Sequence, residues 1–314
     1  MIRFDQVSKS YGRNRQVIDD LTLAIAEGEI CMLVGPSGCG KTTSMKMINR
    51  LVEPDSGTVL VDGRPVNSVD PIKLRLNIGY VIQEIGLFPH MSVADNIATV
   101  PVELGWPKPR VRARVDDLLA LVDLEPGLYR TKRPRELSGG QRQRVGIARA
   151  LAGDPRIMLM DEPFGALDPL TRAKMQDEFL AIQEKIRKTI VFVTHDTDEA
   201  LKMGDHIAVM RAGRLLQYGT PTEILRHPAD TFVADLIGSR KGLKLLRLLD
   251  CGSLMRQGAA AADLPVLPAR ATAEQALSEM LRCGCRSVAV ADASGVTLGR
   301  LDLDDLIDRV ARDD

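Results

Sequence analysis

Short apolar runs, separated by glycine, proline and charged residues, recur through most of the chain. Four of them are almost uninterrupted and are typical of strands buried on both faces of a parallel sheet: 30–34, 78–82, 157–160 and 189–194. Residues 2–7 and 17–26 instead alternate apolar and polar positions, which predicts strands with one buried face. Further strands are predicted at 57–61 and in a hairpin formed by 207–210 and 214–218.

Helical periodicity alternates with these strands. It predicts helices over 41–51, 92–99, 110–122, 142–151 and 169–188, with shorter helices starting at Thr222 and Thr231. The segment 8–12 is predicted to be a turn, and the proline-containing segment 104–109 a connection between two helices. Strands that alternate with helices favour an α/β fold around a parallel sheet.

The character of the chain changes near Gly238. We predict a linker at 239–263, which is first basic and leucine-rich and then rich in alanine. From residue 264 to 314 the pattern predicts a β-α-β-β-α unit, with strands at 266–267, 287–291 and 297–301 and helices at 273–283 and 303–310. A unit of this size is small for an independent domain, so we expect it to pair with a copy of itself from another chain.

The composition narrows the class of protein. The 314 residues are 45% hydrophobic and 27% charged, and the formal net charge is zero. These values are typical of a soluble globular protein and do not suggest nucleic-acid binding. Because no apolar run is long enough to cross a membrane and the first residues lack a signal-peptide pattern, we expect a cytoplasmic protein that can dock onto a membrane protein. The five cysteines form no disulfide or zinc pattern and are interpreted as small apolar residues.

One glycine-rich stretch carries the strongest chemical signal. It runs Gly35-Pro36-Ser37-Gly38-Cys39-Gly40-Lys41-Thr42, between a predicted strand and a predicted helix. The glycines let backbone N–H groups point at one anion, and the helix N-terminus adds its positive end. Lys41 supplies a charge for the outer phosphates, and the Thr42 hydroxyl suits Mg²⁺. The stretch is predicted to bind the phosphates of a nucleoside triphosphate.

Polar side chains follow three of the predicted buried strands. These are Gln83, the pair Asp161-Glu162, and His195. Since ligands bind at the carboxyl ends of parallel strands, we expect these side chains to converge on one edge of the sheet. Asp161 suits Mg²⁺ and Glu162 suits a general base for an attacking water. A histidine after a strand is often only structural, but this convergence favours a phosphate-sensing role for His195.

Three weaker signals remain. Ser138 to Gln141 precedes a predicted helix and is a second potential anion site, with Ser138 as its N-cap. Tyr11 could stack on a purine base, although its position alone favours an ordinary tyrosine at a strand end. Leu87 to Val93 is an apolar loop, and such a loop on a soluble protein suggests a partner surface.

Taken together, the motifs resemble those of the ATP-binding cassette (ABC) family over essentially Ile2 to Gly238. The phosphate loop, Gln83, the Leu137-to-Gln141 signature, the strand ending at Glu162, Ala166-Leu167-Asp168 and His195 occur in the family's order and spacing. One departure is Gly165, where serine is common. The resemblance implies a P-loop NTPase fold at 1–238, with a RecA-like core, an antiparallel β subdomain and a helical subdomain at about 88–155.

The resemblance also implies a role for each motif in a head-to-tail dimer that sandwiches two ATP molecules. Glu162 would activate water, His195 would hold the γ-phosphate together with Lys41, and Gln83 would couple the Mg²⁺ site to a membrane permease near Leu87 to Val93. The residues implied to bind ATP within one chain are Tyr11, Gly35, Pro36, Ser37, Gly38, Cys39, Gly40, Lys41, Thr42, Thr43 and Gln83. Those implied to contact the ATP of the opposite protomer are Ser138, Gly139, Gly140, Gln141 and Asp168, and those implied to hold Mg²⁺ are Thr42, Gln83 and Asp161.

A narrower resemblance is to the ATPase subunits of importers for osmoprotectant quaternary amines: glycine betaine, choline and carnitine. It rests on 46–51, 83–90, 96–101 and 164–169. The unit at 264–314 looks like one cystathionine-β-synthase-type (CBS) repeat. The resemblance implies an ATP hydrolase at the cytoplasmic face of the membrane, which works with a permease and, indirectly, a substrate-binding protein. Importers of amino acids, polyamines or sulfonates remain an alternative, and a soluble cassette ATPase of DNA repair or translation is a weaker one.

Overall fold

The computed structural model describes residues 1–12, 15–83, 86–238, 241–258 and 263–311. Contacts between residues divide the chain into two units. The first contains 1–196 and 203–218, and the second contains 197–202 and 219–314. The sequence-based boundaries at 238 and 263 stay predictions, and the alanine-rich residues 259–262 lie outside the described part of the chain.

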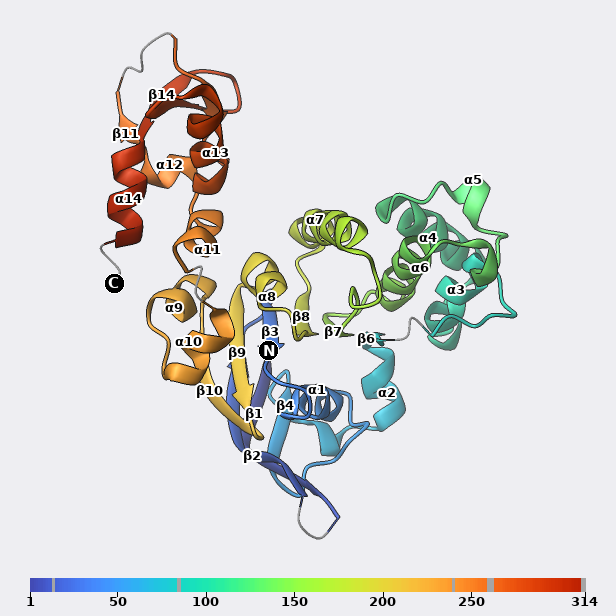
Figure 1. Ribbon diagram of the computed structural model, residues 1–314. Coiled ribbons are helices and arrows are strands. Elements are labelled where there is room, and N and C mark those ends of the chain that lie inside the picture. Colours follow the sequence, from blue (N-terminus) through green and yellow to red (C-terminus); the bar gives the residue numbers. More distant parts are fainter. Residues whose placement is uncertain (13–14, 84–85, 239–240, 259–262, 312–314) are drawn as a thin grey trace. The chain divides into compact units, whose positions relative to one another are not determined.

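A six-stranded sheet forms the centre of the first unit, in the order β10-β9-β3-β8-β7-β6 (Figure 1). Its strands are β3 (Ile30–Val34), β6 (Ile78–Val81), β7 (Ile157–Asp161), β8 (Thr189–Val193), β9 (His206–Arg211) and β10 (Arg214–Gly219). The pairs β3–β8, β3–β9, β6–β7 and β7–β8 are parallel, so β3, β6, β7, β8 and β9 end at the same edge. The predicted parallel sheet is confirmed.

A second sheet, β2-β1-β4-β5, is antiparallel in the pairs β1–β2, β1–β4 and β4–β5. Its strands are β1 (Ile2–Tyr11), β2 (Arg15–Ile25), β4 (Ser56–Val61) and β5 (Arg64–Pro65). The turn predicted at 8–12 is wrong, because β1 continues to Tyr11 through register shifts between Phe4 and Ser10. Pairing with β2 stabilises this polar end as strand, and such tertiary pairing overrides local turn propensity.

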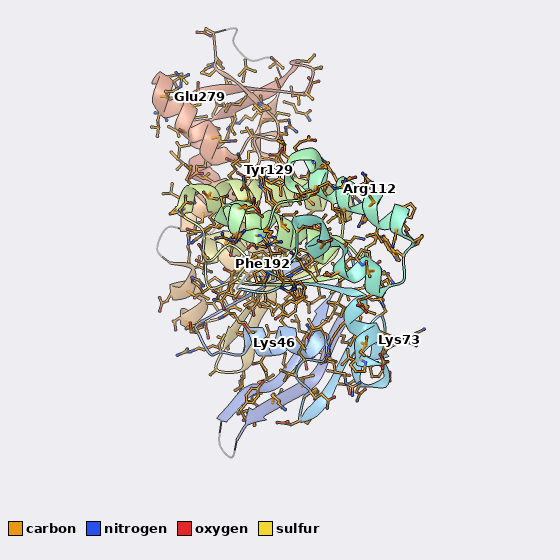
Figure 2. The ribbon with its side chains drawn as sticks, turned by 90° about the vertical axis from the view of Figure 1, so that its right-hand side faces the viewer. Lys46, Lys73, Arg112, Tyr129, Phe192 and Glu279 are labelled. Atoms are coloured by element: carbon orange, nitrogen blue, oxygen red, sulfur yellow. The ribbon has the colours of Figure 1, made fainter. Side chains whose placement is uncertain are left out.

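The two faces of the central sheet carry different layers. On one face, Leu33, Leu159 and Val191 share a core with Met45 of α1 (Lys41–Ile48) and Phe4 of β1. On the other face, an aromatic chain begins at Phe192 of β8, which contacts Phe164, and this ring in turn meets Phe179 of α7 (Pro169–Ile186). Figure 1 shows α1 and α7 on opposite sides of the sheet, and Figure 2 shows Phe192 deep in the packed interior.

The first unit contains further helices, of which α2 and α6 contact β6. They are α2 (Pro71–Leu76), α3 (Val93–Glu103), α4 (Lys108–Leu121), α5 (Pro126–Tyr129) and α6 (Gly139–Leu151), with short 3₁₀ turns at Val66–Ser68 and Pro134–Glu136. Figure 1 shows α3 to α6 gathered into one group. The predicted end of α3 at Thr99 is wrong, since the helix continues through Pro101 to Glu103. None of the helices in the described residues is both long and apolar enough to cross a bilayer.

The second unit contains α8 to α14 and a four-stranded sheet in the order β11-β14-β13-β12. Its helices are α8 (Thr197–Met203), α9 (Pro221–Arg226), α10 (Thr231–Ile237), α11 (Lys241–Leu248), α12 (Cys251–Leu254), α13 (Ala273–Cys283) and α14 (Leu303–Ala311). Its strands are β11 (Arg256–Gln257), β12 (Val266–Pro268), β13 (Ser287–Ala291) and β14 (Thr297–Asp302). The predicted linker therefore contains α11, α12 and β11, and its Leu246 and Cys251 pack in one core with Met280 and Val288.

The aromatic chain leads to a stability prediction. Because Phe179 is buried at the end of that chain, Phe179→Ala should lower the free energy of unfolding by about 3–5 kcal/mol. Ile72→Ala is the control, since Ile72 is 66% exposed and its loss should change stability by no more than about 0.5 kcal/mol. Chemical denaturation of the full chain measures both. Equal effects of the two substitutions would contradict the packing described here.

Candidate functional site

The phosphate loop lies between β3 and α1 and is packed tightly against two other strands. Gly35 has φ +148°, and a Cβ there would collide with the carbonyl oxygen of Met210 in β9. Gly40 has φ +110°, and a Cβ there would meet the Ile18 side chain and lie 2.7 Å from the Val17 carbonyl oxygen of β2. Both positions therefore require glycine.

Lys41 begins α1 and is buried. Its Nζ atom donates to the carbonyl oxygens of Gly35 at 2.7 Å and Pro36 at 3.0 Å. The ammonium thus lies inside the curve of the loop, 3.9 Å from Cys39 Sγ. Burial raises the pKa of the Cys39 thiol, so this cysteine is a neutral packing group in the loop. A positive charge surrounded by backbone suits the binding of a phosphate chain.

Thr42 and Asp161 meet across the start of α1 and the end of β7. The Thr42 hydroxyl donates to Asp161 Oδ1 at 2.9 Å. Burial raises the pKa of Asp161, and the neighbouring Glu162 acts in the same direction. Among the described residues, Asp161 has no ion pair, and a hydroxyl beside such a carboxylate fits Mg²⁺, which takes a few protein oxygens and completes its shell with water and phosphate.

Glu162 is held by side chains that follow the two strands flanking β7. Glu162 Oε2 lies 3.1 Å from His195 Nδ1 and accepts from Gln83 Nε2 at 3.5 Å. The backbone of Glu162 has φ +44°, and its N–H donates to the Val193 carbonyl oxygen at 3.0 Å, which fixes the direction of the side chain. The predicted convergence of these three strand ends is confirmed. The roles assigned to the residues stay predictions.

The signature Ser138 to Gln141 forms the N-terminus of α6. Ser138 is the N-cap, as predicted, and the helix begins at Gly139 rather than at Arg142. The Ser138 hydroxyl accepts from the Gln141 N–H, and the Gln141 side chain accepts from the Ser138 N–H and donates to Tyr129 Oη at 3.0 Å. Within the described residues, no hydrogen bond or ion pair joins this turn to the phosphate loop.

Two further predicted residues also lie apart from the loop. Asp168 caps α7 by accepting from the Thr171 N–H at 3.0 Å, and hydrogen bonds from Thr171 lower its pKa. Tyr11 ends β1 with 47% of its surface exposed and with Lys9 Nζ 5.7 Å from its ring. Neither has a recorded hydrogen bond or ion pair to 35–43 in the described part of the chain.

The predicted partner surface at Leu87 to Val93 borders a groove of about 940 Å³. Phe88, His90 and Met91 line it together with residues of α2, α3, β6 and α6.

Sequence reasoning missed two residues that shape the loop. Buried Asn96 accepts from the Phe88 N–H and donates to the Phe88 and Ser92 carbonyl oxygens, and Arg149 donates to the Gly86 carbonyl oxygen at 2.7 Å. The one signal for Asn96 in the sequence is that an asparagine stands within an otherwise apolar helical pattern. Residues 84–85 of the motif at 83–90 lie outside the described residues.

Comparisons with known proteins agree with this geometry. A family model described as ABC transporter matches residues 18–165. The chain is 53% identical over 241 residues to the glycine betaine/carnitine/choline transport ATP-binding protein OpuCA of Bacillus subtilis, covering 77% of this chain but only 63% of that relative. It is 46% identical to the glycine betaine uptake system ATP-binding protein YehX of Escherichia coli, covering 98% of this chain and 99% of the relative.

Solved structures show the same fold. A dimeric post-hydrolysis structure of the ATP-binding cassette MJ0796, bound to ADP and Pi, superposes with a TM-score of 0.63 and 32% identity. The match covers 70% of this chain and 99% of that cassette.

The tight packing of the loop predicts a strong effect of one added methyl group. Gly40→Ala should weaken ATP binding at least ~10-fold, because its Cβ displaces the loop from β2. Gly63→Ala is the matched control, since Gly63 also has positive φ but a Cβ there has no neighbour within 4 Å. Titration with a fluorescent ATP analogue measures both affinities. An equal loss in the two variants would show that backbone strain alone, and not the contact with β2, is responsible.

Proposed function

The chain belongs to the ABC transporter family as an ATP-binding ATPase subunit, and we propose that it powers import of quaternary-amine osmoprotectants such as glycine betaine, choline and carnitine. The observation that carries the proposal is the similarity to the Escherichia coli glycine betaine uptake protein, which extends over 98% of this chain and includes the C-terminal unit. The Bacillus relative, named for glycine betaine, carnitine and choline, supports the same class of cargo.

In the proposed cycle, the phosphate loop binds the triphosphate of ATP. The Lys41 ammonium exchanges its contacts with the Gly35 and Pro36 carbonyl oxygens for phosphate oxygens, while N–H groups of residues 37–42 surround the β-phosphate. Because the loop is already held between β2 and β9, little ordering is needed on binding. Tyr11, exposed at the end of β1, is available to stack on the adenine.

Thr42, Asp161 and Gln83 would hold Mg²⁺ beside the phosphates. Bound Mg²⁺ supplies charge that stabilises the phosphate oxygens during transfer. Burial raises the pKa of Asp161, and the hydrogen bond from the Thr42 hydroxyl acts in the opposite direction by stabilising the carboxylate. The amide of Gln83 contacts Glu162 and follows β6, whose residues line the groove, so it connects the two sites.

Glu162 is the proposed general base for the attacking water, and His195 the proposed γ-phosphate contact. Their 3.1 Å separation orients both groups. If His195 Nδ1 carries a proton toward Glu162, then Nε2 accepts in the neutral imidazole and donates to a phosphate oxygen only in the imidazolium.

The proposed catalytic unit is a head-to-tail dimer. In one chain, Ser138 to Gln141 and Asp168 have no recorded hydrogen bond to the phosphate loop within the described residues, and each motif caps its own helix. In the dimer, the N-terminus of α6 faces the γ-phosphate held by the partner, so that ATP closes the interface and hydrolysis weakens it. The dimeric state of the related cassette MJ0796 supports this arrangement.

We assign the groove beside Leu87 to Val93 to the membrane permease. The groove is largely apolar, is formed by four different elements and is lined by Ile82, which immediately precedes Gln83, so it suits a helix from a partner. The chain would thus work at the cytoplasmic face of the membrane and meet the substrate-binding protein only through the permease. Import of an amino acid, polyamine or sulfonate is the alternative. The extent of the match to the glycine betaine protein favours the quaternary amines.

Glu162→Gln should separate binding from hydrolysis. The amide keeps the shape of the side chain and its contact with His195 but cannot take a proton, so hydrolysis should fall by about 10²- to 10⁴-fold while ATP affinity is retained. ATP should also shift the variant to a stable dimer in size-exclusion chromatography.

The control for this variant is Glu184→Gln, which removes an exposed carboxylate on the surface of α7 and should leave hydrolysis unchanged. Normal hydrolysis by Glu162→Gln would remove Glu162 from the role of base.

The cargo is tested by transport. Cells that lack this gene should lose uptake of labelled glycine betaine and choline. The wild-type gene should restore uptake, whereas Lys41→Ala should not, because phosphate binding depends on its charge. Uptake of spermidine, measured in the same cells, should not change. Loss of spermidine uptake with normal betaine uptake would favour the alternative importer.

A further inference from the structure

Tyr11 lies at the end of β1, where the second sheet has only two strands. β4 begins at Ser56, which pairs with Ser8, so the last residues of β1 have β2 on one side and no strand on the other. The pairing with β2 is itself irregular, with three register shifts between Phe4 and Ser10. Figure 1 shows the hairpin of β1 and β2 extending past β4. Pairing with β2 holds the backbone here, but the other side of this strand end is left open by the sheet.

Asp55, one residue before β4, occupies this open side. Its N–H donates to the Ser8 carbonyl oxygen at 2.9 Å, and its Oδ2 atom accepts from the Ser10 N–H at 2.7 Å. The other carboxylate oxygen, Oδ1, accepts from Lys9 Nζ at 2.7 Å. The hydrogen bonds from Lys9 and Ser10 lower the pKa of Asp55, so the carboxylate is ionised at neutral pH. One residue thus contacts three successive residues of β1.

Lys9 connects Asp55 to the ring of Tyr11. Its Nζ atom lies over that ring, 5.7 Å from the centroid, which is within the range of a cation–π interaction. The Lys9 side chain is only 17% exposed, whereas Tyr11 is 47% exposed. In the described part of the chain, no other ring contact, hydrogen bond or ion pair of the Tyr11 side chain is recorded. The ammonium therefore lies at one face of the ring, and the opposite face is available to a ligand.

We propose that Asp55 and Lys9 are positioning residues for the adenine of ATP. The Asp55 carboxylate holds the Lys9 ammonium at one face of the Tyr11 ring, and the base stacks on the opposite face. The inference rests on the stacking role proposed for Tyr11. Without the carboxylate, water competes for the ammonium, and the ring loses the group that holds it in the stacking orientation. Because none of these three residues has a hydrogen bond or ion pair to 35–43 within the described residues, the loss falls on the base and not on the phosphates.

The test compares two ligands that share a triphosphate. The hydrolysis-resistant ATP analogue AMP-PNP carries the base, and inorganic tripolyphosphate does not. Asp55→Asn keeps an acceptor for the Ser10 N–H but removes the negative charge that holds Lys9. In isothermal titration calorimetry it should raise the Kd for AMP-PNP about 3- to 10-fold and change the Kd for tripolyphosphate less than about twofold. Steady-state ATP hydrolysis should show a higher KM with an unchanged kcat.

Further variants separate the proposed role from a general effect on β1. Lys9→Met should reproduce the loss, and Lys9→Arg should keep most of the affinity, because a guanidinium also stacks on aromatic rings. In a Tyr11→Ala background, Asp55→Asn should cause no additional loss, since the ring on which it acts is gone. Glu53→Gln is the matched control, because Glu53 pairs with Arg50 at 2.8 Å and has no recorded contact with β1 among the described residues. Its affinity for both ligands should equal that of the wild type.

Three outcomes would overturn the inference. An equal loss of AMP-PNP and tripolyphosphate binding in Asp55→Asn would indicate a general disturbance of the site. A normal affinity for AMP-PNP in Asp55→Asn, with a loss in Tyr11→Ala, would leave the stacking role intact and remove Asp55 from it. A normal affinity in Tyr11→Ala would remove the stacking role together with the inference. In all three cases, ATP hydrolysis that is lost in Glu162→Gln would leave the proposed ATPase function standing.

Discussion

The close packing of the phosphate loop between two strands is the constraint on which the site depends. At Gly40 the loop touches β2, and at Gly35 it touches β9. The Gly213 N–H donates to the Cys39 carbonyl oxygen at 3.1 Å, which adds the hairpin of β9 and β10 to this support. Because backbone atoms of neighbouring strands support the outer side of the loop, its inner side is available to a ligand. The Lys41 ammonium already lies on this inner side. Preorganisation of this kind lowers the entropy lost when ATP binds.

The parallel sheet explains why the acidic residues stand together. The order β8-β7-β6 places the ends of neighbouring strands side by side, so His195 and Gln83 reach Glu162 from either side. The same geometry puts two carboxylates, Asp161 and Glu162, next to each other at a partly buried edge. Burial, and to a lesser extent the neighbouring Glu162 carboxylate, disfavours the ionised form of Asp161 and raises its pKa. Two adjacent carboxylates favour the binding of a cation. The proposed Mg²⁺ site is therefore a consequence of the order of the strands in the sheet.

Most of the fold could be predicted because buried strands and amphipathic helices leave periodic patterns, and strand ends could be assigned to one edge by a general rule. The failures have tertiary causes. The α3 helix passes Pro101 because its packing against α4 and α6 outweighs one missing hydrogen bond. The helices α11 and α12 within the predicted linker were not predicted, and two of the basic residues of α11 are paired in the structure. Their partners, such as Asp198 for Lys244 and Glu274 for Arg247, lie 27 or more residues away in sequence, where no local pattern shows them.

The N-terminus of α6, which we propose to be half of a site completed by a partner, is stable in the single chain. In the single chain, the Ser138 hydroxyl and the Gln141 side chain satisfy each other through the capping box. They therefore need no ligand for the helix to be stable. The N–H groups of Gly139 and Gly140, in the first turn of α6, have no carbonyl acceptor within the helix. In the proposed dimer these two donors, with the helix dipole behind them, would meet the partner's γ-phosphate. Within the chain, a Cβ at Gly139 would lie 3.8 Å from Leu167 Cδ2 and a Cβ at Gly140 would lie 3.4 Å from Thr171 Cγ2, so a larger side chain at either position would crowd the start of α7.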